Sequence, residues 1–331
     1  MSGWVPAVEN PALSHRSDRR HGTMHGVRRT GVLVSAAAAF AIMGGAALVG
    51  VGMNRDGDGG VRSLAGTFAS PPVPTAFPSP TGPTPEELAE KQRAARVAAL
   101  TAALKKYAAT VPEFSVAVLD KTTGHRYSYR GSERYETASV VKVQVLACLL
   151  LHAQDQHRKL TATELALAKR MIRFSDNDAT TSLFARLGRA PAVTRSNHRL
   201  GLTQTIVSGS WGLTRTTVND QVKLLAQLVN ADGPLDGDSR KLAFKLMSTV
   251  DDDQDWGVPV VARTGETATV KNGWLPRSAE GGRWIINTVG RVTGDDVDVS
   301  IAVLSHNHGS MSGGIRVVEK AAKLTRQYLK Y

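Results

Sequence analysis

A lysine lies inside a strongly apolar segment, one helical turn after a serine. Residues 138–154, ASVVKVQVLACLLLHAQ, are apolar nearly all round, which predicts a central buried helix containing Lys142. Ser139 precedes Lys142 by three residues, so both side chains share a helix face. Burial favours a neutral amine, which can serve as general base for a hydroxyl, while free N–H groups at the helix start favour an oxyanion. The alternative is a lysine that extends to solvent and has no chemical role.

A second polar cluster is Ser175-Asp176-Asn177. It joins residues 160–174, whose predicted helix starts at a capping box, to another predicted helix over 178–188. Serine, aspartate and asparagine all cap helices and form turns, so the cluster also has a purely local explanation.

A third cluster, Lys271-Asn272-Gly273, lies in a strand-like apolar segment that ends at Trp274. Glycine inside a strand allows another backbone to approach closely. The alternative is an ordinary edge-strand lysine, and residues 263–265 (RTG) are a rival for the same position.

The elements that must position these clusters form two groups. Strand patterns occur near the two ends of the domain, helical patterns lie between them, and one further helix stands at each end. We therefore expect an α+β (mixed α/β) fold, with an antiparallel sheet flanked by terminal helices, an all-helical lobe, and a site in the cleft between the lobes. The predicted strands are 114–120, 126–130, 268–274, 283–292 and 297–307, and the predicted helices include 216–230 and 314–330.

The chain before this domain shows a membrane signal. Residues 31–53 hold no charged side chain and, as a helix, are long enough to cross a bilayer. The arginine-rich residues 1–30 before them predict a cytoplasmic N-terminus. Residues 54–86 form a proline-rich linker, ending at a helix start built from Thr84, Pro85 and Glu87. Residues 87–331 would then be an extracytoplasmic domain on a single-pass anchor. A cleaved signal peptide, giving a secreted protein, is the alternative.

Composition excludes several classes of function. The 331 residues include one cysteine, Cys148, so an intramolecular disulfide and an all-cysteine zinc site are excluded, and lipid attachment after the apolar segment is not expected. The net charge of +12 comes without a run of like charge, which argues against nucleic acid and suits either solubility or an anionic cell-wall matrix. Neither the His306-Asn307-His308 segment nor the aspartates of 251–255 has a metal-site signature, and we expect no metal or cofactor.

Taken together and in this order, S-V-V-K, S-D-N and K-N-G resemble the motifs of the penicillin-recognising serine hydrolases, the group of class A β-lactamases and D-Ala-D-Ala peptidases. The resemblance covers most of residues 87–331. It implies a β-lactamase-like fold with an acyl-serine intermediate.

The resemblance also implies roles. Ser139 would be the acylated nucleophile and Lys142 its base. Ser175 would relay a proton to the leaving nitrogen, and Asn177 would orient Lys142 and bind the amide side chain of the substrate. Asp176 would be structural.

Residues of the third motif would bind substrate. Lys271 would attract its carboxylate, Gly273 would allow close approach, and the N–H groups of Ser139 and Trp274 would form the oxyanion hole. Asn272 replaces the threonine or serine that is usual in this family, so an amide would take the place of the hydroxyl that binds the carboxylate.

A second departure concerns deacylation. Class A β-lactamases hydrolyse the acyl-enzyme with a loop glutamate, whereas residues 179–219 hold no Asp or Glu. We expect slow deacylation by an anchored serine hydrolase that acts on β-lactams or peptidoglycan stem peptides. The alternatives are a non-catalytic domain that binds cell-wall fragments as a sensor or scaffold, and a true β-lactamase in which Lys142 itself activates water.

Overall fold

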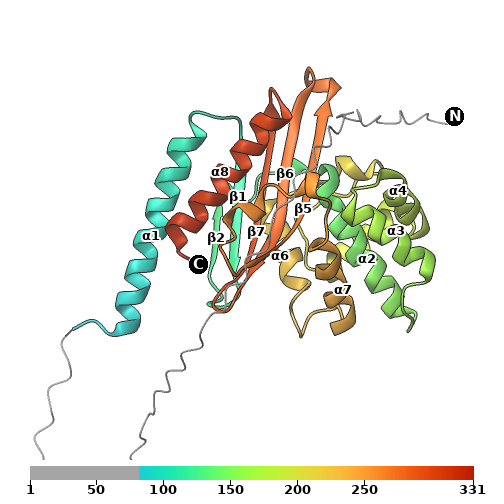
Figure 1. Ribbon diagram of the computed structural model, residues 1–331, viewed down its shortest axis with the longest axis horizontal. Helices are drawn as coiled ribbons and strands as arrows, with labels where there is room; N and C mark the ends of the chain where they lie inside the picture. The colour runs from blue at the N-terminus through green and yellow to red at the C-terminus, as the bar shows by residue number, and fades with distance from the viewer. Residues whose placement is uncertain (1–81) are drawn as a thin grey trace, which may run out of the picture. The chain divides into compact units, whose positions relative to one another are not determined.

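The structure is a computed structural model that describes residues 82–331 (Figure 1). The predicted cytoplasmic segment 1–30, the predicted anchor 31–53 and the linker up to residue 81 lie outside the described residues. Within residues 82–331, none of the helices combines the length and apolar character needed to cross a bilayer.

A five-stranded antiparallel sheet forms the centre of the described chain, in the order β2-β1-β7-β6-β5, which leaves β5 at one edge. Its strands are β1 (Phe114–Asp120), β2 (Arg126–Tyr129), β5 (Thr267–Arg277), β6 (Arg283–Thr293) and β7 (Asp298–His308). The terminal helices α1 (Pro85–Ala108) and α8 (Met311–Leu329) lie together on one side of this sheet (Figure 1).

The other side of the sheet carries the helical lobe (Figure 1). This arrangement confirms the predicted α+β fold. The lobe contains α2 (Val141–Asp155), α3 (Ala162–Arg173), α4 (Asn177–Arg186), α5 (Arg189–Arg199), α6 (Val218–Gln227) and α7 (Gly237–Met247).

Alternation along the strands explains why both faces of the sheet are covered. Val116 and Val118 of β1 belong to the core beneath α1 and α8, whereas Ala117 and Leu119 belong to the core of the helical lobe. Successive side chains of a strand point to opposite faces, so an apolar strand needs cover on both.

Short elements lie in the segments between the main helices and strands. They are the two-stranded sheet of β3 (Tyr135–Glu136) and β4 (Arg215–Thr216), and the 3₁₀ turns η1 (Ala138–Val140), η2 (Trp211–Leu213), η3 (Asp252–Gln254), η4 (Val258–Val261) and η5 (Ser278–Glu280), the last between β5 and β6. The predicted helix over 138–154 thus begins as a 3₁₀ turn, and the α-helix starts at Val141.

Candidate active site

Ser139 and Lys142 lie at the junction of η1 and α2. Lys142 is fully buried, and its Nζ lies 2.9 Å from Ser139 Oγ, whereas Ser139 is partly exposed. The backbone of Ala138, just before the serine, has a φ of 46°, a value that is uncommon for a residue with a side chain. Strained backbone of this kind is found most often at functional sites.

The segment before Ser139 is held by a buried asparagine of the sheet. Asn287 of β6 donates its Nδ2 to the carbonyl oxygens of Glu136 (2.9 Å) and Thr137 (3.0 Å), and its Oδ1 accepts from the N–H of Ser305. The N–H of Thr137 donates to Thr214 O at 2.8 Å. These bonds fix the backbone that carries the serine to both the sheet and the loop before β4.

The turn between α3 and α4 supplies the second group. Lys142 Nζ lies 2.6 Å from the carbonyl oxygen of Ser175, 3.0 Å from Ser175 Oγ and 2.9 Å from Asn177 Oδ1. Asp176 caps α4 through the N–H of Ala179 (2.8 Å) and so has the structural contact that was expected.

Lys271 of β5 completes the cluster from the sheet. It is fully buried, and its Nζ lies 3.1 Å from Ser175 Oγ, 3.4 Å from Gln254 Oε1 and 2.8 Å from Asn272 O. The rival segment 263–265 lies in an exposed turn ahead of β5. The structure therefore brings Ser139, Lys142, Ser175, Asn177 and Lys271 together, and segment 263–265 is not part of this cluster.

Asn272 points elsewhere. Its Nδ2 donates to the carbonyl oxygens of Gln254 and Trp256, both at 2.8 Å, and the side chain is buried. Both amide hydrogens are thus bound by main chain. This differs from the expectation that the amide takes the place of a substrate-binding hydroxyl, because both of its donors are already engaged by Gln254 O and Trp256 O.

Gly273 is where β5 meets η1. A Cβ on this residue would lie 2.7 Å from Ser139 N and 2.8 Å from Thr137 O, which no real side chain tolerates. The predicted close backbone approach is confirmed. Trp274, the next residue, is half-buried, and its ring lies edge-on to that of Trp256 at 6.1 Å between centroids.

Burial controls the charge of both lysines. It lowers the pKa of Lys142 well below 10.5, and the nearby Lys271 lowers it further, against a smaller opposing effect of Asp176. Burial also lowers the pKa of Lys271 to about 7. Both lysines are therefore far easier to deprotonate than a lysine in water.

Trp211 is a site residue that the sequence interpretation missed. Lys142 Nζ lies 5.1 Å from the centroid of the Trp211 ring, and Trp211 Nε1 donates to Thr181 Oγ1 at 3.2 Å. One feature of the sequence could have indicated this residue. Trp211 lies within residues 179–219, the stretch without Asp or Glu in which a catalytic carboxylate was sought.

The remaining candidates take no part. His308 is buried against Ser305 Oγ at 2.9 Å, His306 lies 3.7 Å from Glu113, and Cys148 is buried beside Ser196. Within residues 82–331, no three His, Cys, Asp or Glu side chains lie close enough together to hold a metal ion.

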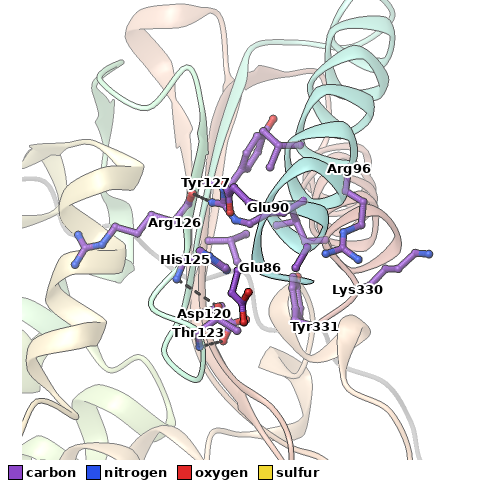
Figure 2. Close-up of a pocket in the computed structure, with 15 residues that line it drawn as sticks. Glu86, Glu90, Arg96, Asp120, Thr123, His125, Arg126, Tyr127, Lys330 and Tyr331 are labelled. Atoms are coloured by element: carbon purple, nitrogen blue, oxygen red, sulfur yellow. Dashed lines mark hydrogen bonds and ion pairs between the residues drawn. The ribbon is translucent and has the colours of Figure 1, made fainter. Parts of the chain in front are cut away.

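A cavity of about 460 Å³ lies elsewhere, between α1, the β1–β2 hairpin and the last residues of the chain (Figure 2). Its side chains carry both signs of charge, and Arg93 within it pairs with Glu90 at 3.2 Å. None of the site residues named above lines this cavity.

Comparisons with known proteins bear on both the family and the fold. The profile of the Beta-lactamase enzyme family matches residues 150–329, more than half of the chain, including Ser175, Asn177 and Lys271 but beginning after Ser139 and Lys142. "Putative lipoprotein LppW" of Mycobacterium tuberculosis (strain ATCC 25618 / H37Rv) is 30% identical over 169 residues, covering 49% of this chain and 54% of that protein. The chain thus spans about half the length of the curated relatives it matches.

Solved structures share the fold at low sequence identity. An ancestral class A β-lactamase of Gram-negative bacteria is 22% identical with a TM-score of 0.59, covering 69% of this chain and 99% of that chain. A β-lactamase from Xanthomonas campestris is 18% identical with a TM-score of 0.59, covering 72% of this chain and 98% of that chain. The fold is that of the class A β-lactamases, and with the family match over residues 150–329 the chain belongs to the β-lactamase enzyme family.

Proposed function

We propose that the chain is a serine hydrolase that is acylated at Ser139, with Lys142 as general base, by β-lactams or by peptidoglycan stem peptides. The observation that carries this proposal is the 2.9 Å contact between Lys142 Nζ and Ser139 Oγ at a fully buried amine. A nucleophile and a base within hydrogen-bond reach are the minimum for covalent catalysis by serine.

The hydrogen-bond partners of Lys142 fit a neutral amine. A neutral amine has two N–H donors and one lone pair. The carbonyl oxygen of Ser175 and Asn177 Oδ1 can only accept, so they take the two donors. The lone pair can then accept a hydroxyl proton, from Ser139 Oγ at 2.9 Å or from Ser175 Oγ at 3.0 Å. This is the arrangement that a general base needs before attack.

The acylation step follows from these contacts. Ser139 Oγ attacks the carbonyl carbon of the substrate, and its proton passes to Lys142 Nζ. The N–H groups of Ser139 and Trp274 are proposed to bind the resulting oxyanion. Ser175 Oγ, which lies within 3.1 Å of both lysines, passes a proton to the leaving nitrogen and regains one from Lys142. The carbon–nitrogen bond breaks, and the acyl group remains on Ser139 as an ester.

We further propose that deacylation is slow. Residues 179–219 hold no carboxylate, and no carboxylate is among the hydrogen-bond partners of Lys142. A water molecule attacking the ester would need a base of its own. A slow second step favours a peptidoglycan peptidase over a β-lactamase that turns over rapidly.

The proposed location is the outer side of the cell membrane. The uncharged segment 31–53 would be the anchor, and the proline-rich residues 54–86 would separate the catalytic domain from the bilayer. The curated relative described as a lipoprotein supports a membrane-associated, extracytoplasmic setting.

Labelling by a fluorescent penicillin tests the proposed function. The parent chain should take up the label at one site and Ser139→Ala should not, while both unfold at similar temperatures. Equal labelling of both chains, or no labelling of either, contradicts the proposal.

A second candidate function is non-catalytic binding of cell-wall fragments. It is favoured by Asn272, whose amide donors are engaged by Gln254 O and Trp256 O and leave β5 without the usual carboxylate-binding hydroxyl. Muropeptide binding that saturates, survives Ser139→Ala and leaves no adduct in mass spectra would support this function over hydrolysis.

A further inference from the structure

The indole of Trp211 lies over the Lys142 amine. Three residues, Ser139, Ser175 and Asn177, supply the four oxygen atoms around Nζ, and the Trp211 ring lies 5.1 Å away. The amine is fully buried in this surrounding. An aromatic face attracts a cation but cannot hold and activate a water molecule as a carboxylate would.

The ring is fixed in this position from two directions. Its Nε1–H donates to Thr181 Oγ1 on α4 at 3.2 Å. The residues that follow it are tied to the segment before Ser139, since Thr137 Oγ1 lies 3.4 Å from Gly212 O and Thr137 N donates to Thr214 O at 2.8 Å. Trp211 also packs against the core of the helical lobe. The indole is therefore part of the wall of the site.

We propose that Trp211 is a positioning residue that excludes water from Lys142 and so prolongs the life of the acyl-enzyme. This inference rests on the proposed acylation of Ser139 and assigns the slow second step to a particular side chain. This effect would be distinct from that of the missing loop carboxylate, because a ring so close to the amine would leave less room for a water bound to Lys142.

The chemistry that the ring prevents can be written in full. A water oxygen would attack the ester carbonyl carbon on Ser139 while Lys142 Nζ takes a proton from that water. The bond from the carbonyl carbon to Ser139 Oγ would then break, and Oγ would recover the proton from Lys142. The attack needs a water molecule within hydrogen-bond distance of Nζ.

Intact-mass spectrometry of the full chain with benzylpenicillin separates the two steps. The acylation rate is read from the growth of the adduct, and its half-life is read after excess drug is removed. Trp211→Ala should shorten the half-life by roughly tenfold or more, because general-base activation of water contributes ~10²–10⁴-fold when it is allowed. The acylation rate should change much less than the half-life.

Two variants refine the test. Trp211→Phe keeps a ring over the amine and should largely restore the parent half-life. Thr181→Val removes only the acceptor that holds the indole and should shorten the half-life by roughly two- to tenfold, the range of one neutral hydrogen bond. Trp284→Ala is the matched control and should leave the half-life unchanged, because Trp284 is a partly buried tryptophan of β6 that packs against the core beneath α1 and α8.

The outcomes are separable. An unchanged half-life in both Trp211→Ala and Thr181→Val overturns the inference while leaving the proposed function intact, as does equal shortening by Trp284→Ala. Absence of any adduct on the parent chain overturns the proposed function, and this inference with it. If Trp211→Ala does not fold by circular dichroism, Thr181→Val and Trp211→Phe decide the matter by the same readout.

Discussion

Two buried amines lie on either side of one hydroxyl. Ser175 Oγ is 3.0 Å from Lys142 Nζ and 3.1 Å from Lys271 Nζ. Two ammonium groups this close together and away from water would repel one another strongly. The cluster therefore favours one neutral and one charged lysine near neutral pH, which divides the tasks of base and anion attraction between them.

Replacing Lys142 with arginine tests the neutral amine. Arginine stays protonated at any accessible pH and has no lone pair to offer. Lys142→Arg should reduce the rate of Ser139 acylation by at least about 10²-fold, the usual contribution of a general base. Stopped-flow labelling with a fluorescent penicillin measures the rate.

The control for this substitution is Lys241→Arg, on the exposed face of α7, which should acylate as fast as the parent. Parent-like acylation by Lys142→Arg would show that Lys142 contributes only its charge.

The lowered pKa of Lys271 should make the stability of the folded chain depend on pH. Its pKa is about 7 in the folded chain and 10.5 ordinarily, so between these values the unfolded chain binds more protons. This lysine therefore penalises folding fully below about pH 7, and the penalty disappears as the pH rises toward 10.5. Lys271→Met removes the penalty and should raise the unfolding temperature at pH 7 by roughly 5 °C.

The advantage of Lys271→Met over the parent should shrink between pH 7 and pH 10, as followed by circular dichroism. A constant difference across that range would mean that Lys271 is not desolvated in solution.

Among the elements, the contact between β5 and η1 sets the geometry of the site. Because β5 is an edge strand, one side of it is free to lie against the main chain of Ser139. Gly273→Ala would place a Cβ 2.7 Å from Ser139 N and must push the two backbones apart. We expect a loss of about 1–3 kcal/mol of stability and strongly reduced acylation.

Gly237→Ala is the matched control, because its nearest neighbour is the end of Arg240 at 3.8 Å. Denaturant unfolding and acylation rates measure both variants. If Gly273→Ala were as stable and as active as Gly237→Ala, β5 would not lie against η1 in solution.

Elements with strong local signals could be predicted from the sequence. The capping boxes at Thr84 and Thr161 start α1 and α3 as expected, and β1 matches its alternating pattern from Phe114 to Asp120. The predictions missed α5, whose sequence is polar and contains Pro191, and α7, which begins at a glycine. Neither helix has a strong local sequence signal, and the formation of both depends on packing within the lobe.

Some contacts within the site follow from local sequence pattern, and others depend on tertiary packing. The pairing of Lys142 with Ser139 follows from helix spacing, and the family resemblance implied separate roles for Ser175 and Lys271. The contact between Ser175 and Lys271 comes from tertiary packing. The contact between Trp211 and Lys142 depends on how a loop folds back over α4, which no periodicity encodes. The orientation of Asn272 depends in the same way on tertiary packing, since its amide is held by the main chain of Gln254 and Trp256.

At the scale of the molecule, residues 82–331 form two apolar cores of their own. One lies between the sheet and α1 with α8, and the other fills the helical lobe. Residues 82–331 should therefore fold without the preceding chain, with an unfolding temperature within about 4 °C of that of the longer protein. Calorimetry of both forms checks this, and an unfolded 82–331 fragment would contradict it.

Ser139 should be the residue that carries the acyl group. Benzylpenicillin should add the mass of one intact drug molecule to the parent chain, and peptide mapping should place it on the peptide that contains Ser139. Ser139→Ala should show no adduct under the same conditions. No mass increase on the parent, or an adduct that survives Ser139→Ala, would contradict the account.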